Sequence, residues 1–252
     1  MSNLFWLTDV QMARLQPFFP KSHGRPRVDD RRVLSGMIFV NRNGLRWCDA
    51  PREYGPSKTL YNRWKRWSRM GVFTRIMTGL AAEAADEKTI MIDATYLKTH
   101  RTASSLRPEK GGRGRLIGRT KGGMNTKLHA VTDAAGRPIR FFITAGQVSD
   151  YTGAAALLSS LPKADWMLAD RGYDADWFRD ALNDKGIKAC IPGRKGRKKP
   201  VRHDKRRYKR RNRIEIMFGR LKDWRRVATR HDRCPIVFLS AIALAATVLF
   251  WL

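Results

Sequence analysis

The alternation of apolar and polar positions predicts three helices in the first third of the chain. The first begins at Thr8, because Thr8 and Gln11 have the spacing of a capping box, and it ends near residues 17–20. A second is expected over residues 30–40, with a glycine stop signal at position 44. A third is expected over residues 57–71, because apolar residues recur there at i, i+4 and i+7. Those inward residues are Leu60, Trp64 and Trp67, and the expected outward basic residues are Lys58, Arg63, Lys65, Arg66 and Arg69.

Two helices followed by a basic, aromatic third helix are typical of a helix-turn-helix DNA reader. We therefore expect residues 1–85 to form a small all-α, helix-turn-helix-like domain that binds DNA through Arg63, Lys65 and Arg66. A solvated bundle whose basic face only follows the overall charge is the alternative. Arg25 and Arg27, in the segment Gly24-Arg25-Pro26-Arg27, resemble a minor-groove arm. A Gly-Pro turn with incidental arginines explains that segment equally well.

Beyond the small and acidic residues at 81–88, the pattern becomes strand-like. Short apolar runs predict strands at residues 89–92, 127–132, 139–144, 166–169 and 188–191. The turn at 133–136 joins the second and third strands into a hairpin. Helices are expected at residues 151–161 and 174–185, and again after the last strand. This order predicts an α/β fold over residues 86–252, a ribonuclease-H-like mixed five-stranded sheet with flanking helices.

Residues 236–252 are almost wholly apolar and approach the length of a bilayer span. Ser240 and Thr247 interrupt the run, and a strongly basic segment precedes it. We therefore expect a buried C-terminal helix, with a membrane anchor as the weaker alternative.

The net charge of the chain indicates what kind of partner it binds. Among 252 residues, 51 are Lys or Arg and 22 are Asp or Glu, for a formal net charge of +29. Such a balance indicates nucleic acid or an anionic membrane. We favour nucleic acid, because the basic residues occur along the whole length. The three cysteines are far apart and match neither a disulfide framework nor a zinc site, which favours free thiols in a reducing cytosol. No secretion signal is recognised, and a cytoplasmic, nucleoid-associated protein is expected.

The most basic segment contains a helix with a single carboxylate on its polar face. Half of residues 193–226 are Lys or Arg. At about 100° per residue, one arc of roughly 60° collects Tyr208, Arg211, Glu215 and Lys222. A neighbouring apolar stripe consists of Ile214, Met217, Phe218 and Leu221. A carboxylate beside a polyanion costs electrostatic free energy unless a cation lies between them, and a divalent metal is the obvious candidate.

Two further carboxylates follow predicted apolar strands. Asp93 comes directly after the first strand and Asp170 after the fourth. Strand ends border the ligand crevice in open α/β sheets, so Asp93, Asp170 and Glu215 are expected to converge if the two strands are neighbours. Such hard oxygen ligands select Mg²⁺ or Mn²⁺, and two ions can activate a water or a 3′-hydroxyl against a phosphodiester. Either aspartate alone is explained as well by an ordinary turn-forming role.

The other polar residues of the stripe suit a phosphate grip. Arg211 offers a planar fork and Lys222 a point charge for phosphates near the metal site. Tyr208 is expected to pack on the backbone or stack on a base.

These motifs resemble those of bacterial insertion-sequence transposases with an Asp-Asp-Glu triad, particularly the insertion sequence 5 family. Tyr208-x2-Arg211-x3-Glu215-x6-Lys222 is similar to the family's signature. Ile92-Asp93-Ala94-Thr95 is similar to its first motif, and Ala169-Asp170-Arg171-Gly172-Tyr173-Asp174 to its second. Further similar stretches at residues 24–27, 44–47, 64–67, 122–129 and 146–150 extend the resemblance over nearly the whole chain.

The resemblance implies a DNA transposase whose catalytic, metal-binding residues are Asp93, Asp170 and Glu215. It implies binding to terminal inverted repeats, Mg²⁺- or Mn²⁺-dependent hydrolysis at each 3′ end, and strand transfer into target DNA. Synapsis of two ends implies at least a dimer. Two other classes stay open at this point: a DNA-binding protein without activity, and a structure-specific nuclease that cuts without joining.

Overall fold

A mixed sheet forms the centre of the computed structural model, which describes residues 4–21, 29–86, 88–104, 114–197 and 199–252. The order of its longer and central strands is β4-β3-β1-β5-β6. The pairs β4–β3 and β3–β1 are antiparallel, whereas β1–β5 and β5–β6 are parallel. These strands are β1 (Thr89–Thr99), β3 (Gly123–Thr132), β4 (Pro138–Ala145), β5 (Trp166–Leu168) and β6 (Lys188–Cys190). Two short strands, β2 (Gly118–Thr120) and β7 (Thr229–Arg230), pair with β3 and β1.

All five predicted strands and the β3–β4 hairpin are present, but the first strand is longer than predicted. We expected it to end before Asp93, where the apolar run stops. That prediction was wrong, because β1 continues in register with β3 from Met91↔Thr132 to Lys98↔Asn125. The backbone pairing of β1 therefore extends beyond its apolar segment, and Asp93 lies within the strand.

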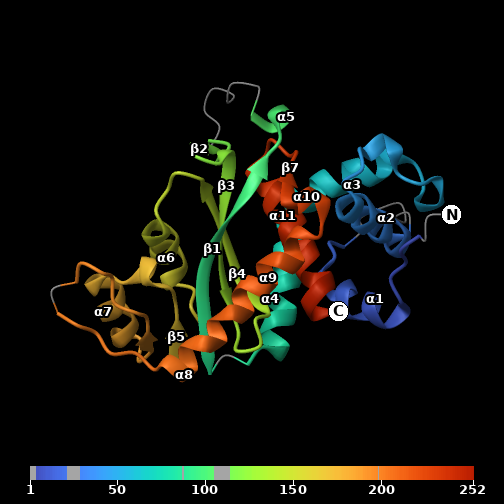
Figure 1. The fold of residues 1–252 in the computed structure, drawn as a ribbon. Helices are drawn as coiled ribbons and strands as arrows, with labels where there is room; N and C mark the ends of the chain where they lie inside the picture. The colour runs from blue at the N-terminus through green and yellow to red at the C-terminus, as the bar shows by residue number, and fades with distance from the viewer. Residues whose placement is uncertain (1–3, 22–28, 87, 105–113, 198) are drawn as a thin grey trace.

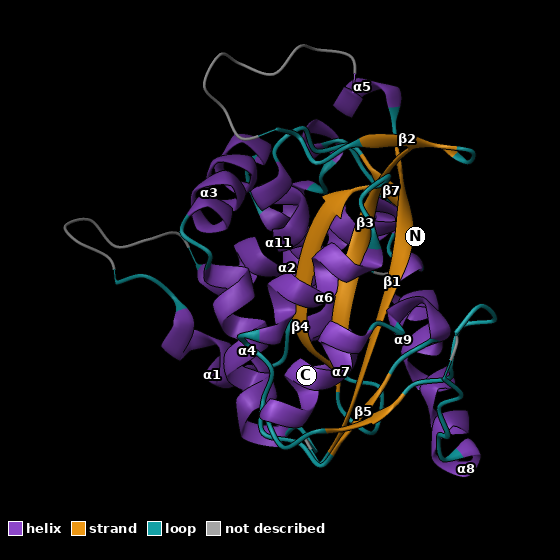
Figure 2. Cartoon of the chain, turned by 90° about the vertical axis from the view of Figure 1, so that its left-hand side faces the viewer, coloured by secondary structure: helices purple, strands orange, loops and turns teal. Residues whose placement is uncertain are grey.

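Helices cover both faces of the sheet, as expected (Figures 1 and 2). On one face, α6 (Asp150–Leu158) and α7 (Asp176–Asp184) bury a core that includes Ile90 and Ile92 of β1. The opposite face belongs to a larger core with Met91 and Leu97, covered by α9 (Asn212–Lys222) and α11 (Pro235–Ala246). Side chains alternate between faces along a strand, so Asp93 and Thr95 lie on the same side as α9.

The N-terminal helices pack on the α11 side of the molecule (Figure 1). They are α1 (Asp9–Leu15), α2 (Asp30–Asn43), α3 (Ser57–Arg69) and α4 (Val72–Ala84). The capping box of Thr8 and Gln11 forms as predicted, and Gly44 ends α2 with a left-handed φ of 71°. Helix α4 was not predicted. Its buried residues, such as Phe73, share one apolar cluster with the other N-terminal helices and α11.

The C-terminal segment is buried, as expected. Helix α11 continues into a π-helical turn over Thr247–Trp251, and the Trp251 Nε1–H donates to the Pro138 carbonyl at 3.1 Å. Within the described residues, no helix is both long enough and apolar enough to cross a membrane.

Candidate active site

The parallel pairing of β1 with β5 brings two acidic residues to one place. Its register runs from Thr89↔Trp166 to Met91↔Leu168. Continued by two residues, it sets Asp93 of β1 level with Asp170, which follows β5. Asp93 is mostly buried, with 16% of its side chain exposed, and its Oδ1 accepts the backbone N–H of Ala94 at 2.8 Å. The Asp170 carboxylate caps a 3₁₀ turn over Arg171–Tyr173 by accepting the Gly172 N–H at 2.9 Å.

Glu215 reaches the same place through Arg211. The Arg211 Nη1 donates to Asp93 Oδ2 at 2.7 Å, and its Nη2 bonds to Glu215 Oε1. One guanidinium thus joins a carboxylate of the central strand to one on α9. The predicted single helix from Tyr208 onward is three consecutive helical segments, α8 (Lys205–Tyr208), a 3₁₀ turn (Lys209–Arg211) and α9. The backbone changes from 3₁₀ to α-helical after Arg211, but the side chains of Arg211 and Glu215 still lie on one side of the segment.

Asp93 experiences the charges of the residues around it. Burial raises the pKa of Asp93 to about 6; the Ala94 N–H and Arg211 oppose the rise, while the negative charges of Asp170 and Glu215 add to it. Within the described residues, no three His, Cys, Asp or Glu side chains already stand in an arrangement to hold a metal ion. The space between Asp93 and Glu215 nevertheless holds a cationic group, because both carboxylates form ion pairs with the Arg211 guanidinium. Carboxylate oxygens of this kind fit Mg²⁺ or Mn²⁺.

The remaining predicted residues of the polar stripe flank this site. The Lys222 Nζ donates to Thr95 Oγ1 at 2.7 Å, two residues along β1 from Asp93. Burial lowers the pKa of Lys222. The Arg211 guanidinium lies over the Tyr208 ring, 5.8 Å from its centre. Tyr208, Arg211, Glu215 and Lys222 therefore line one side of the α8–α9 segment, as predicted, next to the β1 carboxylate.

One of the basic residues expected on the outward face of α3 is buried. Arg63 donates to Asp30 at 2.6 Å and lies over the Trp67 ring, 5.7 Å from its centre. Its outward placement as a DNA contact was wrong, because position 63 follows Leu60 by three residues and so shares its inward face. Arg66 is exposed and Lys65 is half-buried over Tyr61. Arg25 and Arg27 lie outside the described residues.

Two polar residues near the site were missed by the sequence analysis. Thr95 is the acceptor for Lys222, and its only sequence signal is its place two positions after Asp93. Asp174 is completely buried and binds three arginines at the end of the turn that begins with Asp170. Its sequence signal was the spacing of four residues from Asp170.

Two models of known protein families match the chain. A family model described as "Transposase DDE domain" matches residues 84–251, and one described as "Putative transposase of IS4/5 family" matches residues 7–77. The chain belongs to the DDE transposases of the IS4/5 family. Together the two models cover almost all of this transposase, and residues 78–83, within α4, lie between the two matched ranges.

Curated relatives agree with that membership. The transposase is 39% identical over 131 residues to a Brucella ovis protein named "Putative transposase for insertion sequence element IS6501", a match that covers 51% of this chain and 99% of the relative. It is 29% identical over 156 residues to a Burkholderia cepacia protein named "Putative transposase for insertion sequence element IS402", covering 54% of this chain and 72% of that one.

A solved structure shares the fold. A piggyBac transposase, determined as a synaptic complex with hairpin DNA, matches with a TM-score of 0.55 over 94% of this chain and 68% of that chain. Only 8% of the aligned residues are identical, so the likeness concerns the fold alone.

Proposed function

We propose that this transposase binds the terminal inverted repeats of an insertion sequence, hydrolyses the phosphodiester at each 3′ end and transfers the 3′-hydroxyl into target DNA. Asp93, Asp170 and Glu215 are its proposed catalytic residues. The observation that supports the proposal is a single guanidinium that joins a carboxylate of β1 to one of α9, beside the strand that leads into Asp170. The β1–β5 register sets Asp93 level with Asp170, and Arg211 joins Asp93 to Glu215.

The proposed catalytic unit is a ribonuclease-H-like domain over residues 86–252. Its support is the strand order β4-β3-β1-β5-β6, with an antiparallel meander followed by two parallel strands and helices on both faces. In this arrangement the central strand β1 carries Asp93 and its parallel neighbour leads into Asp170.

The three carboxylates are the proposed ligands of Mg²⁺ or Mn²⁺, with two ions in the working site. If bound there, such ions would help to activate a water or a 3′-hydroxyl and would stabilise the leaving oxygen of the phosphodiester. Asp93 serves as a ligand only as a carboxylate, and because burial raises the pKa of the metal-free group to about 6, metal binding below that pH has to displace a proton. Arg211 has to release Asp93 or Glu215 to expose their oxygens.

The cations of the polar stripe are the proposed grip on DNA beside the carboxylates. Arg211, when released, and Lys222 would hold phosphates, and Tyr208 would pack against the backbone or a base. Residues 1–85 are the proposed helix-turn-helix-like, end-binding domain, with Lys65 and Arg66 as its contacts and Arg25 and Arg27 as a minor-groove arm. Because two ends have to be held together, at least a dimer is proposed, which the synaptic complex of the piggyBac transposase supports.

The test uses purified full-length protein, Mg²⁺, and a duplex carrying the DNA that flanks the gene, including any inverted repeats. Asp93→Asn, Asp170→Asn and Glu215→Gln should each abolish 3′-end cleavage while end binding persists in a mobility-shift assay. Full cleavage by one variant removes that residue from the triad. Supplying precut ends and a plasmid target separates two activities, because a transposase yields joined product and a nuclease yields only cut ends.

A further inference from the structure

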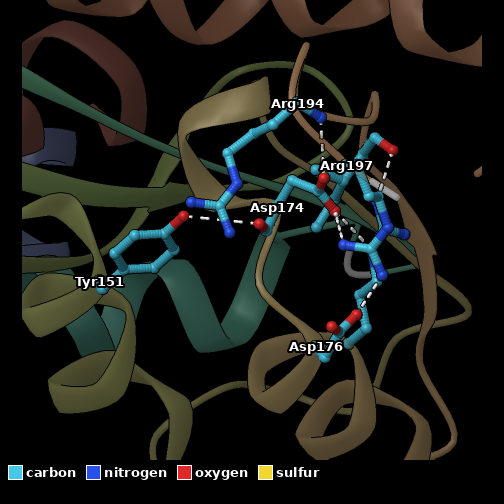
Figure 3. Close-up of polar contacts among 7 residues, drawn as sticks. Tyr151, Asp174, Asp176, Arg194 and Arg197 are labelled. Carbon is cyan, nitrogen blue, oxygen red and sulfur yellow. Dashed lines mark hydrogen bonds and ion pairs between the residues drawn. The ribbon is translucent and has the colours of Figure 1, made fainter. Parts of the chain in front are cut away.

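The buried carboxylate of Asp174 contacts Arg194 and Arg197 of a cationic segment (Figure 3). The segment is residues 193–197 and 199–203, called the basic loop below. Asp174 Oδ2 accepts the backbone N–H of Arg194 at 2.8 Å, and its Oδ1 accepts from Arg197 Nη1 at 2.9 Å. Its third partner, Arg179 of α7, donates from Nε at 2.9 Å. The side chain of Asp174 is fully shielded from solvent.

These contacts are well suited to hold a loop that has no regular structure of its own. Burial of a carboxyl favours its protonated form, but the Arg194 N–H and the Arg179 guanidinium outweigh burial and keep the pKa of Asp174 below its ordinary value. Arg179 also donates to the Ile191 carbonyl at 2.8 Å, just before the loop. A buried carboxylate with several charged donors is costly to disrupt, because loss of a partner leaves an uncompensated group.

The anchored loop presents cations that no acid neutralises. Lys195, Lys199 and Arg202 are exposed and form no ion pair with any described residue. Arg197, by contrast, is paired with both Asp174 and Asp176, so its charge is already neutralised. Arg194 lies over the Tyr151 ring of α6, 5.6 Å from its centre. Arg194 and Arg197 therefore attach the loop, whereas Lys195, Lys199 and Arg202 remain available to bind an anion.

The position of Asp174 ties this loop to the candidate active site. Asp170 caps the start of the 3₁₀ turn Arg171–Tyr173, and Asp174 is the residue that ends it. Tyr173 between them is buried, which fixes the turn in the core. One short, rigid segment therefore carries a proposed catalytic carboxylate at one end and the anchor of the basic loop at the other.

We propose that Asp174 is a positioning residue that holds the basic loop as a phosphate-binding surface, with Lys195, Lys199 and Arg202 gripping the DNA strand that reaches Asp170. The proposal rests on the proposed DNA function and adds to it a second grip, separate from the Tyr208–Lys222 stripe. Phosphate oxygens are the ligand, so this grip is independent of base sequence.

Asp174→Asn tests the proposal, because charge and position predict opposite results. The variant has one negative charge fewer, which by charge alone strengthens DNA binding. If Asp174 positions the loop, affinity for a fluorescein-labelled duplex of arbitrary sequence falls about fivefold instead, and the log–log salt slope flattens by about one unit. Asp180→Asn is the matched control: Asp180 is exposed, lies by the same loop and has no ion pair among the described residues. Equal or tighter binding by Asp174→Asn relative to Asp180→Asn overturns the proposal.

A double-mutant cycle gives a readout that general loss of structure does not imitate. The triple substitution of Lys195, Lys199 and Arg202 by Ala should weaken binding strongly in the wild-type background. In the Asp174→Asn background the same substitution should weaken binding less, because the loop no longer places those cations well. Equal losses in both backgrounds contradict a positioning role.

If Asp174→Asn does not fold, a second matched pair carries the test. Arg197→Gln breaks one anchor contact but removes a cation that two aspartates already neutralise, whereas Lys195→Gln removes an available cation and leaves the anchor intact. The proposal predicts that Arg197→Gln lowers DNA affinity although the cation it removes is already neutralised, together with faster amide exchange at Arg194. Lys195→Gln should also lower affinity but leave the exchange at Arg194 unchanged. Wild-type DNA affinity in Arg197→Gln overturns the proposal. Absence of DNA binding by the wild-type protein would instead refute the proposed function itself.

Discussion

Arg211 donates to Asp93 at 2.7 Å across a separation of 118 residues, and the same guanidinium bonds to Glu215. The Arg211 guanidinium therefore occupies oxygens of two of the three proposed metal ligands. A metal ion bound by these carboxylates would therefore compete with Arg211 for their oxygens.

Arg211→Gln should bind divalent ions more tightly than the wild type. The substitution removes the competing charge-assisted bonds, worth roughly 1.5–3 kcal/mol, which corresponds to about tenfold or more in affinity. Titration calorimetry with Mn²⁺ measures the effect directly. Arg210→Gln, at a neighbouring exposed arginine with no ion pair among the described residues, is the control for lost charge. Equal Mn²⁺ affinity in the two variants contradicts competition by Arg211.

Lys222→Met should reduce the salt dependence of DNA binding. Lys222 is held toward β1 by Thr95, and loss of one phosphate contact should flatten the log–log salt slope by about one unit. Thr95→Val removes the hydrogen bond and keeps the cation, so its slope should stay near that of the wild type. An unchanged slope in Lys222→Met excludes Lys222 from the DNA grip.

Arg63→Met should destabilise the N-terminal helices without acting as the loss of a DNA contact. It removes the Arg63–Asp30 ion pair of 2.6 Å, and breaking a largely buried pair costs about 3 kcal/mol. Arg66→Ala, at an exposed position of the same helix, should change stability by about 0.5 kcal/mol or less. Urea unfolding measures both. DNA affinity, measured at low urea, should fall more in Arg66→Ala than in Arg63→Met.

Stability should fall as the pH drops from about 6.5 to 4, because His129 is buried. Burial lowers its pKa to about 4, so across this window the unfolded chain binds a proton that the folded chain does not. The stabilising contribution is therefore complete above pH 6.5 and is lost on acidification, by up to about 3 kcal/mol. Denaturant unfolding at several pH values should show a shallower pH dependence in His129→Gln. The same slope in both proteins contradicts the assignment to His129.

Much of the fold follows from local pattern. The five strands, the hairpin, the capped first helix and the buried C-terminal helix were all predictable, because period and turn residues are properties of short segments. Helix α4 was missed although its buried residues recur at helical spacing and Thr74, Arg75 and Thr78 mark an outer face, so this local signal was present in the sequence. The end of β1 was misplaced because pairing with β3, not the apolar run, carries the strand on to Thr99.

For the candidate site, too, some features follow from local sequence pattern and others depend on tertiary contacts. The sequence alone determined the residue types and the one-sided stripe of Tyr208, Arg211, Glu215 and Lys222, since helical periodicity is local. It also marked Asp93 and Asp170 by the apolar strands before them. The tertiary structure decided that β1 and β5 pair in a register that sets those aspartates level. It also decided that Arg63 turns inward to Asp30 and that Asp174 anchors the basic loop. Each of these depends on partners far away in the chain, which burial and hydrogen bonding select only once the chain has folded.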